Sequence, residues 1–262
     1  AAELERLSDW KVADRLRIDS RCPVILPEHK EAERADAFLS GVVGSTLSGT
    51  GQCQSRFALR QCPQARDIPS LAPWLADVAG DVNRACLRGE TVIVEGSQGT
   101  LLSLALSQDY PYVTSGNCTA TAAADQVGLR MDCVDEVVLV VKAVPSRVGS
   151  GPLPGEMDLA EQDRRGIGEY GVRTGRRRRK AGGIPWDLLR ESVLLNGPTQ
   201  IALTFVDHFD PEQAGRQELT AKVRGLVDQV ERECGVPVTI LDRGKRFGDM
   251  GPLHRSMVRT LP

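Results

Sequence analysis

The sequence predicts an α/β fold with a mainly parallel central sheet flanked by helices. Short apolar, β-branched runs alternate along the chain with segments of helical periodicity, the order from which such sheets are built. The runs are almost continuously apolar, as expected for strands covered on both faces. Glycine-rich loops follow the first two runs closely. In open sheets of this kind ligands bind beyond the carboxyl ends of the strands, so a site is expected at these loops.

The strands are expected in four short segments rich in Val, Ile and Thr. Each segment is closely followed by glycine, proline or aspartate, which end strands readily. The expected strands are residues 91–95, 136–141, 201–205 and 236–241.

Apolar residues spaced by three and four predict two helices between these strands. The first would end near Gly89 and carries Leu71, Trp74, Leu75, Val78, Val82 and Ala85. The second would end at Gly235 and carries Leu219, Val223, Leu226, Val227 and Val230. No internal repeat or low-complexity linker interrupts the chain, so residues 1–262 are predicted to form a single domain.

Composition and charge narrow the classes of function. The 262 residues carry a net charge of −2, so no global field draws the protein to nucleic acid or to an anionic membrane. The longest apolar runs are strand-sized and the first residues are charged, which is typical neither of a membrane span nor of a signal peptide. The seven cysteines are widely spread, without metal-ligand spacing. We expect reduced thiols, a cytoplasmic location and no metal ligands among these residues.

A turn rich in hydroxyls is the first candidate binding segment. Residues 44–51 read Gly-Ser-Thr-Leu-Ser-Gly-Thr-Gly, and hydroxyls with backbone N–H groups in such a turn can cradle a phosphate. The alternative is a solvent-exposed turn without a ligand. The segment is not a P-loop, because no Gly-Lys-Ser/Thr ending follows.

Two further positions suit the recognition of a base. Gln98 lies in the tight turn Glu-Gly-Ser-Gln-Gly-Thr, and its amide offers one acceptor and two donors to the edge of a purine. Asp207 follows the third expected strand, where its carboxylate could accept from the N1–H and the N2 amine of guanine. The alternatives are a solvated glutamine and a surface aspartate.

Residues 173–180, Arg-Thr-Gly-Arg-Arg-Arg-Arg-Lys, form a dense basic segment in a nearly neutral chain. Arginine forks bind carboxylates and phosphates through two parallel hydrogen bonds. The alternatives are a solvated basic loop and a nucleic-acid contact. The second is disfavoured because no aromatic residues are interleaved for base stacking.

Taken together and in this order, the motifs resemble the adenylosuccinate synthase family, in particular its shorter archaeal-type members. The segments that carry the resemblance are 94–100, 110–115, 146–156 and 169–179, and residues 22–30 also look like the family. The resemblance spans nearly the whole chain. It implies a GTP-dependent C–N ligase that joins IMP and L-aspartate to adenylosuccinate in purine nucleotide synthesis, with Mg²⁺ as cofactor.

The resemblance also implies a role for individual residues. Gln98 would be catalytic, contacting the purine and stabilising the charge that develops at its 6-oxygen. Arg60 would reach the IMP of a neighbouring subunit, which implies a homodimer. The remaining IMP-binding residues would be Ser45, Thr46, Thr114 and Val148, and the aspartate-binding residues would be Thr174, Arg176 and Arg178. Asp207 would bind the guanine of GTP.

The sequence departs from the family pattern in several places. Leu47 replaces a glycine in the phosphate turn, Arg173 replaces a small residue in the aspartate loop, and residues 181–185 are an insertion. The Gly-Asp-Glu-Gly-Lys-Gly-Lys motif that opens the family is not among these residues, so we expect an N-terminally truncated domain, inactive alone, whose Mg²⁺ ligands lie in the preceding segment. In the GTP region Phe205 replaces a lysine, and residues 242–247 replace the usual Thr-Gly-Pro-Asp. The IMP and aspartate sites are therefore better supported than the GTP site.

Two other functions remain open at this point. A phage branch of the family joins (d)GMP and aspartate on the route to 2-aminoadenine, and its phosphate turn begins Gly-Ser-Thr as this one does. If these residues are the entire chain, a nucleotide-binding protein without catalysis is the other possibility.

Overall fold

A computed structural model describes residues 2–171 and 174–253, which divide into two compact units. Unit 1 consists of Ala1–Ser107 and Val113–Val134, and unit 2 consists of Gln108–Tyr112 and Asp135–Pro262. Each unit is described by itself. A single domain over residues 1–262 stays a prediction, for which one cooperative unfolding transition would be the signature.

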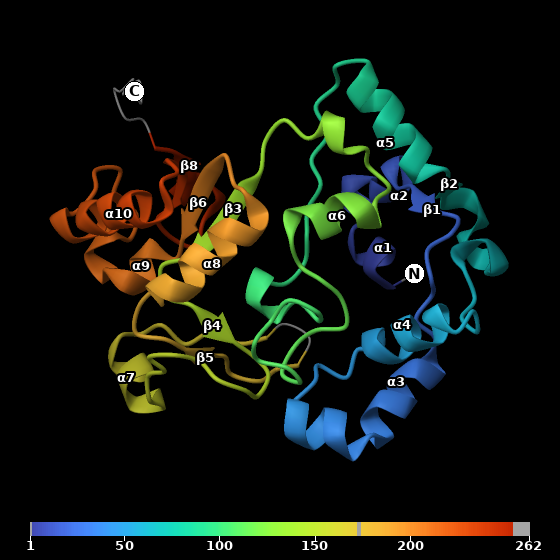
Figure 1. The fold of residues 1–262 in the computed structure, drawn as a ribbon, viewed down its shortest axis with the longest axis horizontal. Helices are drawn as coiled ribbons and strands as arrows, with labels where there is room; N and C mark the ends of the chain where they lie inside the picture. Colours follow the sequence, from blue (N-terminus) through green and yellow to red (C-terminus); the bar gives the residue numbers. More distant parts are fainter. Residues whose placement is uncertain (1, 172–173, 254–262) are drawn as a thin grey trace. The chain divides into compact units, whose positions relative to one another are not determined.

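The central sheet belongs to unit 2 (Figure 1). Its strand order is β3-β6-β7-β8, with bounds Val138–Lys142, Gln200–Thr204, Val238–Asp242 and Met250–Pro252. The β3, β6 and β7 strands are parallel, and β8 pairs with β7 in the antiparallel sense. The predicted α/β fold with a mainly parallel sheet is therefore confirmed, as are the strands expected at 136–141, 201–205 and 236–241.

Burial differs between the middle and the edge of this sheet. In β6 the residues Ile201, Ala202 and Leu203 are all buried, as predicted for a strand covered on both faces. In β3 the side chains of Val138 and Val140 are exposed, Val140 by 65%. The prediction of two covered faces is therefore wrong for β3, which ends the strand order and presents one face to solvent.

Helices α8 (Trp186–Asn196) and α10 (Ala221–Cys234) accompany the sheet in unit 2. The second predicted helix is α10. It begins after Thr220, whose Oγ1 accepts the N–H of Val223 at 3.2 Å, and it ends at Gly235 with φ 65°. The helices bury their apolar faces in a core formed by Val141, Ala143, Ile184, Leu189, Ile201, Leu203, Val206, Val223, Leu226, Val227, Val230, Val238 and Leu241.

Short elements complete unit 2. A two-stranded antiparallel ladder joins β4 (Ser146–Arg147) and β5 (Arg179–Lys180). The remaining elements are helices α7 (Leu159–Arg164) and α9 (Val206–Phe209) and the 3₁₀ turns η7 (Pro211–Gln213) and η8 (Phe247–Asp249).

Unit 1 is built from short helices and turns. Its two strands, β1 (Ile18–Asp19) and β2 (Leu75–Ala76), are parallel. The α-helices are α1 (Ala2–Arg6), α2 (Val12–Arg15), α3 (Pro27–Ala35), α4 (Thr50–Ala58), α5 (Val78–Leu87) and α6 (Ala120–Gln126). The other turns are η1 (Ser8–Trp10), the π-helical η2 (Phe38–Val43), η3 (Ala65–Asp67), η4 (Pro69–Trp74), η5 (Thr100–Leu102) and η6 (Met131–Cys133).

Two expectations for unit 1 need correction. Residues 91–95 are not a strand, and Ile93 is 87% exposed, because no described segment pairs with this run. The helix expected from residue 71 begins only at Val78, since Pro73 interrupts the pattern and Asp77 provides the N-cap. It ends at Leu87, shortly before Gly89, as predicted. None of the described helices is long and apolar enough to cross a bilayer.

Candidate functional site

The hydroxyl-rich turn of unit 1 closes on one buried carboxylate. Helix η2 ends at Gly44, whose φ of 69° turns the chain, and the N–H of Ser45 donates to the carbonyl of Leu39 at 2.9 Å. Glu33, 4% exposed, accepts hydrogen bonds from the Ser45 hydroxyl at one oxygen and from the Gly49 N–H at the other. The Ser45 side chain therefore points inward and shapes the turn.

The other hydroxyls of this turn form a chain. The Thr46 hydroxyl lies 3.2 Å from that of Ser48, which lies 3.0 Å from that of Thr50. Thr46 is exposed, and Thr50 begins α4. Hydroxyls beside the first turn of a helix suit an anionic ligand, because the N-terminal N–H groups point the same way. Ser48 and Thr50, which belong to the candidate segment 44–51 but were not named as IMP-binding residues, thus lie beside the expected Thr46.

Gln98 has an unusual backbone conformation. Its φ is 71°, in the left-handed region, although it carries a side chain. It is exposed, and no described residue hydrogen-bonds its amide. Side-chain-bearing residues held in this region are strained and concentrate at functional sites, which favours the predicted role of Gln98.

Arg60 and Thr114 complete the predicted IMP residues of unit 1. Arg60 follows α4 with a φ of 62°, is exposed, and donates from Nη1 to the Ala58 carbonyl at 2.8 Å. Thr114 is half-buried, and its N–H donates to the Leu102 carbonyl at 2.8 Å. Val148 lies in unit 2, so assembly of the predicted IMP residues into one site stays a prediction.

Val148 is half-buried and follows a well-anchored arginine. The Arg147 guanidinium donates to the Pro152 carbonyl at 3.1 Å, to the Tyr112 carbonyl and to Asp109. Arg147 thereby fixes the loop that carries Val148, and sequence reasoning did not single it out.

Three cations surround one carboxylate in unit 2. Glu169 lies 3.2 Å from Lys142 Nζ, 3.0 Å from Arg178 Nε and 2.8 Å from Lys180 Nζ. The Arg178 contact is an ion pair without hydrogen-bond alignment. Burial would raise the pKa of Glu169, but the hydrogen bond from Lys180 and the charges of Lys142 and Lys180 outweigh it and hold this pKa below its ordinary value. The cluster therefore carries excess positive charge.

Phe205 and His208 lie next to this cluster. The Phe205 ring centroid is 4.3 Å from Lys142 Nζ and 5.4 Å from Lys180 Nζ, both within cation–π range. Burial and the charge of Lys180 lower the pKa of His208, so its ring is neutral at neutral pH. Its Nδ1 lies 3.4 Å from Lys180 Nζ and accepts from that group, since an ammonium can only donate.

The basic segment is not a uniformly solvated run. Arg177 donates to Asp163 at 2.7 Å, Arg179 donates to Glu156 at 2.7 Å, and Lys180 is fully buried. The alternative of a solvated basic loop is therefore wrong for these three residues, whose partners lie 11 or more residues away in sequence. Arg173 lies outside the described residues.

The predicted aspartate residues Thr174 and Arg176 lie in a closed turn. The Gly171 N–H donates to the Arg176 carbonyl at 2.9 Å, and the Gly175 N–H donates to the Gly171 carbonyl at 2.8 Å. Gly175 has a φ of 62°, and the Arg176 N–H donates to the Thr174 hydroxyl at 3.2 Å. The Arg176 side chain is exposed on a fixed backbone, whereas Arg178 is half-buried against Glu169.

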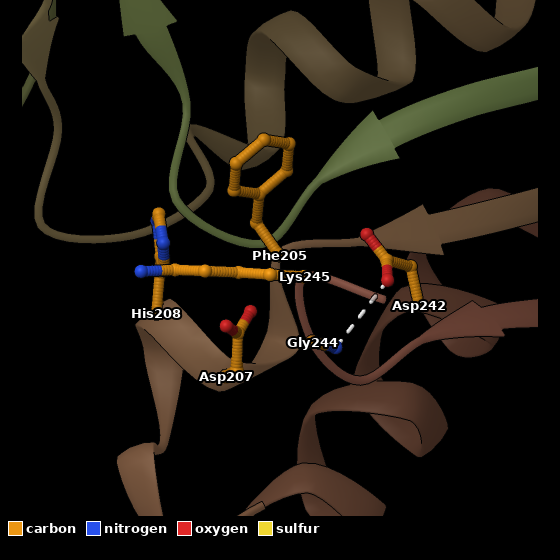
Figure 2. A pocket seen from close by; sticks show the side chains of 6 residues that line it. All are labelled: Phe205, Asp207, His208, Asp242, Gly244 and Lys245. Atoms are coloured by element: carbon orange, nitrogen blue, oxygen red, sulfur yellow. Dashed lines mark hydrogen bonds between the residues drawn. The ribbon is translucent and has the colours of Figure 1, made fainter. Parts of the chain in front are cut away.

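A pocket of about 300 Å³ opens in unit 2 at the carboxyl ends of β6 and β7. It is lined by Phe205, Asp207, His208, Asp242, Gly244 and Lys245. Figure 2 shows the Lys245 side chain extending across the pocket towards His208, near Asp207. The pocket lies beyond the carboxyl ends of two parallel strands, where ligands bind in open α/β sheets, but not at the glycine-rich loops after the first two runs, where a site was expected. It contains the predicted Asp207. Asp242 and Lys245 were not predicted as site residues, although Asp242 directly follows the strand expected at 236–241.

The described donors do not fit Mg²⁺. The ligand atoms of His29, Cys53 and Cys62 lie within 4.8 Å of one another, but they are nitrogen and sulfur, whereas Mg²⁺ takes oxygen. Among the described residues, no three carboxylates lie as close together as these three side chains do.

The chain resembles proteins of known identity. The family model described as adenylosuccinate synthetase matches residues 65–214. An adenylosuccinate synthetase from Pyrococcus sp. (strain ST700) is 44% identical over 245 residues, which cover 92% of this chain and 72% of the relative.

Two solved structures share the fold. The fully ligated adenylosuccinate synthetase of Plasmodium falciparum matches with a TM-score of 0.83 and 18% identity, covering 97% of this chain and 82% of that one. The succinoaminodeoxyadenylate synthetase of cyanophage S-2L, bound to dGMP and dATP, matches with a TM-score of 0.73 and 24% identity, covering 90% and 68%.

Proposed function

Because the chain belongs to the adenylosuccinate synthetase family, we propose that it serves the family's reaction, the GTP-dependent ligation of IMP and L-aspartate to adenylosuccinate. In that reaction the 6-oxygen of IMP attacks the γ-phosphate of GTP, and the amine of aspartate then displaces phosphate. In this chain the side-chain amide of Gln98 is assigned to the purine, the hydroxyl turn at residues 44–50 to the phosphate of IMP, and residues 174–176 to L-aspartate.

The observation that carries the proposal is the closed turn around Gly175. Its two backbone hydrogen bonds and the Thr174 hydroxyl hold the main chain at Arg176, so the guanidinium has little backbone freedom to lose on binding. A planar fork in that position matches a carboxylate with two parallel hydrogen bonds. Thr174, Arg176 and Arg178 are therefore proposed to bind L-aspartate.

The test is the affinity for L-aspartate in the presence of IMP. Charge-assisted hydrogen bonds contribute about 1.5–3 kcal/mol. Removing the fork in Arg176→Leu should therefore weaken L-aspartate binding about tenfold to a hundredfold, at about 1.4 kcal/mol per factor of ten. Arg176→Lys should recover only part of the loss, because it restores the charge without the bidentate geometry. Arg164→Leu, an exposed arginine of α7, is the control. Unchanged affinity in Arg176→Leu would remove this residue from the site.

The phosphate of IMP is proposed to bind at the hydroxyl turn, with Thr114 as a further donor. Thr46→Val removes an exposed hydroxyl without changing shape, and it should weaken IMP binding about tenfold. Ser45→Ala instead removes a donor to buried Glu33, so its larger effect should be on the free energy of unfolding. Calorimetric titration with IMP and urea unfolding of both variants separate the two roles.

A comparison of nucleotides separates the IMP reaction from the phage-type reaction. IMP should bind more tightly than dGMP, because the Pyrococcus relative is the more similar protein and the phage structure shares the fold alone. Tighter binding of dGMP would favour the phage-type activity instead. Binding of either nucleotide, without phosphate release on adding GTP and L-aspartate, would favour a binding protein.

The pocket at Asp207 is proposed to bind the guanine of GTP, with Mg²⁺ on the phosphates as in the family. The Asp207 carboxylate could accept hydrogen bonds from both the N1–H and the N2 amine of guanine, and Lys245 lines the same pocket. Asp207→Asn should therefore weaken GTP more than inosine triphosphate, which lacks the N2 amine. Equal weakening of both would argue against the N2 contact, and unchanged affinity for both would place the guanine elsewhere.

We further propose a homodimer and a cytoplasmic location. Arg60 is exposed beyond the end of α4, which leaves it accessible to a neighbouring subunit's IMP. Light scattering should give twice the chain mass at micromolar concentration. Arg60→Ala should weaken IMP binding in the dimer, and a monomer that binds IMP normally would contradict this role.

A further inference from the structure

Two cysteines of unit 1 lie close together, and neither is among the residues proposed to bind IMP, L-aspartate or GTP. The Sγ atoms of Cys53 in α4 and Cys62 in the following loop are 3.4 Å apart. Cys53 is 2% exposed, whereas Cys62 is only half-buried. A disulfide requires the sulfurs to approach to about 2.05 Å, a further movement of about 1.4 Å. Cys62 lies outside any helix or strand, so the loop can supply that movement.

We infer that Cys53 and Cys62 are an oxidative modification site, at which a hydroperoxide converts the dithiol to a reversible disulfide. The reaction starts at Cys62, the less buried of the two residues. Burial and the neighbouring Cys62 raise the pKa of Cys53 to about 12, so Cys53 remains a thiol until its partner is oxidised.

The chemistry needs no other group of the protein. The Cys62 thiolate attacks one oxygen of the hydroperoxide, the O–O bond breaks, and the leaving oxygen takes a proton. The Cys53 sulfur then attacks the sulfur of the sulfenic acid, the S–O bond breaks, and water leaves with the Cys53 proton. With hydrogen peroxide, two thiols and one peroxide give one disulfide and two molecules of water. A small dithiol reverses the reaction by exchange.

The same cluster could instead bind a soft metal, because a ring nitrogen of buried His29 lies within 4.8 Å of both sulfurs. The hydrogen bonding of His29 argues against this. Its Nδ1 accepts the Leu26 N–H at 3.0 Å, so the proton of the neutral ring is on Nε2 and leaves that nitrogen without a lone pair for a metal. A structural zinc site also takes four ligands, and this group offers three.

Oxidation would change the segment that carries Arg60. The bond would close a loop from residue 53 to residue 62, and Arg60 lies inside that loop with a φ of 62°. Movement of Cys62 towards α4 would therefore shift Arg60. This consequence rests on the proposed role of Arg60 in IMP binding, whereas the disulfide itself does not.

Peptide mapping tests the disulfide directly. The chain is treated with a small excess of hydrogen peroxide, its free thiols are alkylated, and it is digested with trypsin. Cleavage after Arg34, Arg56, Arg60 and Arg66 places Cys53 in peptide 35–56 and Cys62 in peptide 61–66. We expect these two peptides joined, with the loss of two hydrogen atoms, and separated again by dithiothreitol. Alkylation of both cysteines after peroxide treatment would refute the inference.

Variants define the order of events. Cys53→Ala should trap the sulfenic acid at Cys62, detectable with dimedone, and Cys62→Ala should leave Cys53 largely unmodified. Cys22→Ala, which removes an exposed cysteine of the same unit, should leave the disulfide unchanged. The wild-type mapping stands on its own if a variant fails to fold. Peptide 85–88 joined to 131–142 through Cys86 and Cys133, with Cys53 and Cys62 free, would overturn the assignment, as would zinc retained stoichiometrically on these thiols.

Discussion

The two units hold their candidate ligand groups in different ways. In unit 2 the groups rest on a sheet with a large apolar core, and Glu169 ties three cations together next to that core. In unit 1 the buried apolar residues described are the small Cys53, Ala65 and Ala124, and the candidate groups lie on turns. Those turns are fixed by left-handed residues such as Gln98 and by the carboxylate of Glu33. Unit 2 thus relies on packing and charge, and unit 1 on backbone conformation.

The largest difference should appear on removing the charge of Glu169. Glu169→Gln leaves the fully buried Lys180 and the half-buried Lys142 and Arg178 without their shared carboxylate. Breaking a fully buried ion pair costs about 3–5 kcal/mol, which is the upper bound for this partly exposed cluster. Urea unfolding measures this loss. In Glu161→Gln, the exposed carboxylate of α7 that pairs with Arg164 and Arg165, the free energy of unfolding should hardly change. Equal losses in both variants would mean that the cluster does not stabilise unit 2.

The same carboxylate makes unit 2 sensitive to acid. The pKa of Glu169 is lower in the folded chain than the ordinary value of 4.5, so the contribution of this carboxylate to stability is complete above that value. The contribution is lost as the pH falls through the folded pKa, because protonation is then required. The free energy of unfolding should be measured between about pH 6 and about pH 3, a range that brackets the usual carboxyl pKa values. It should fall less steeply with decreasing pH in Glu169→Gln than in the wild type.

The next largest difference between the units should be the loss of stability when an apolar side chain is shortened. Leu203→Ala removes a fully buried side chain of β6, and such changes cost about 2–5 kcal/mol. Ile93→Ala in unit 1 removes a side chain that is 87% exposed, and the expected change is within about 0.5 kcal/mol. Thermal and chemical unfolding measure both. A large loss in Ile93→Ala would show that residues 91–95 are packed and that the unit 1 description is wrong.

The smallest effect concerns backbone strain in unit 1. Gln98→Gly relieves a left-handed conformation, which costs a side-chain-bearing residue about 1–2 kcal/mol, partly offset by the entropy of glycine in the unfolded chain. We expect a net gain of up to about 1 kcal/mol, with weaker IMP binding because the amide is lost. Lys11→Gly, at a φ of 49°, should give a similar gain without affecting IMP. A loss of stability in Gln98→Gly would contradict the strain argument.

Local sequence signals predicted the regular elements that tertiary contacts also favour. The β6 and β7 strands and α10 were found because apolar spacing and end signals agree with their burial. Residues 91–95 have the same β-branched composition and failed as a strand, because a strand also needs a neighbour to pair with. The composition of a segment indicates its β-strand propensity, but whether it forms a strand also depends on a second segment that can pair with it.

The candidate site was predictable where its residues lie within one short segment. The hydroxyl turn, the Gln98 turn and the Gly175 turn are of this kind. The cluster around Glu169 was not predicted, because Lys142 comes from β3, Lys180 from β5, and Glu169 lies 11 residues before Lys180. The inward direction of the Ser45 hydroxyl was also missed, since Glu33 is 12 residues away in sequence.

The two hydrogen bonds of Glu33 bear on how fast and how selectively the hydroxyl turn would bind its proposed ligand, the phosphate of IMP. One oxygen of its carboxylate binds the Ser45 hydroxyl near the start of the turn, and the other binds the Gly49 N–H near its end. The shape of the turn is therefore established when unit 1 folds, before any ligand arrives. If the turn binds the phosphate of IMP as proposed, the anion would not have to order the loop, so association would need no slow closing step and would lose little backbone entropy. At the proposed phosphate site the same rigidity should disfavour bulkier anions, because widening the turn would break its contacts with the buried carboxylate.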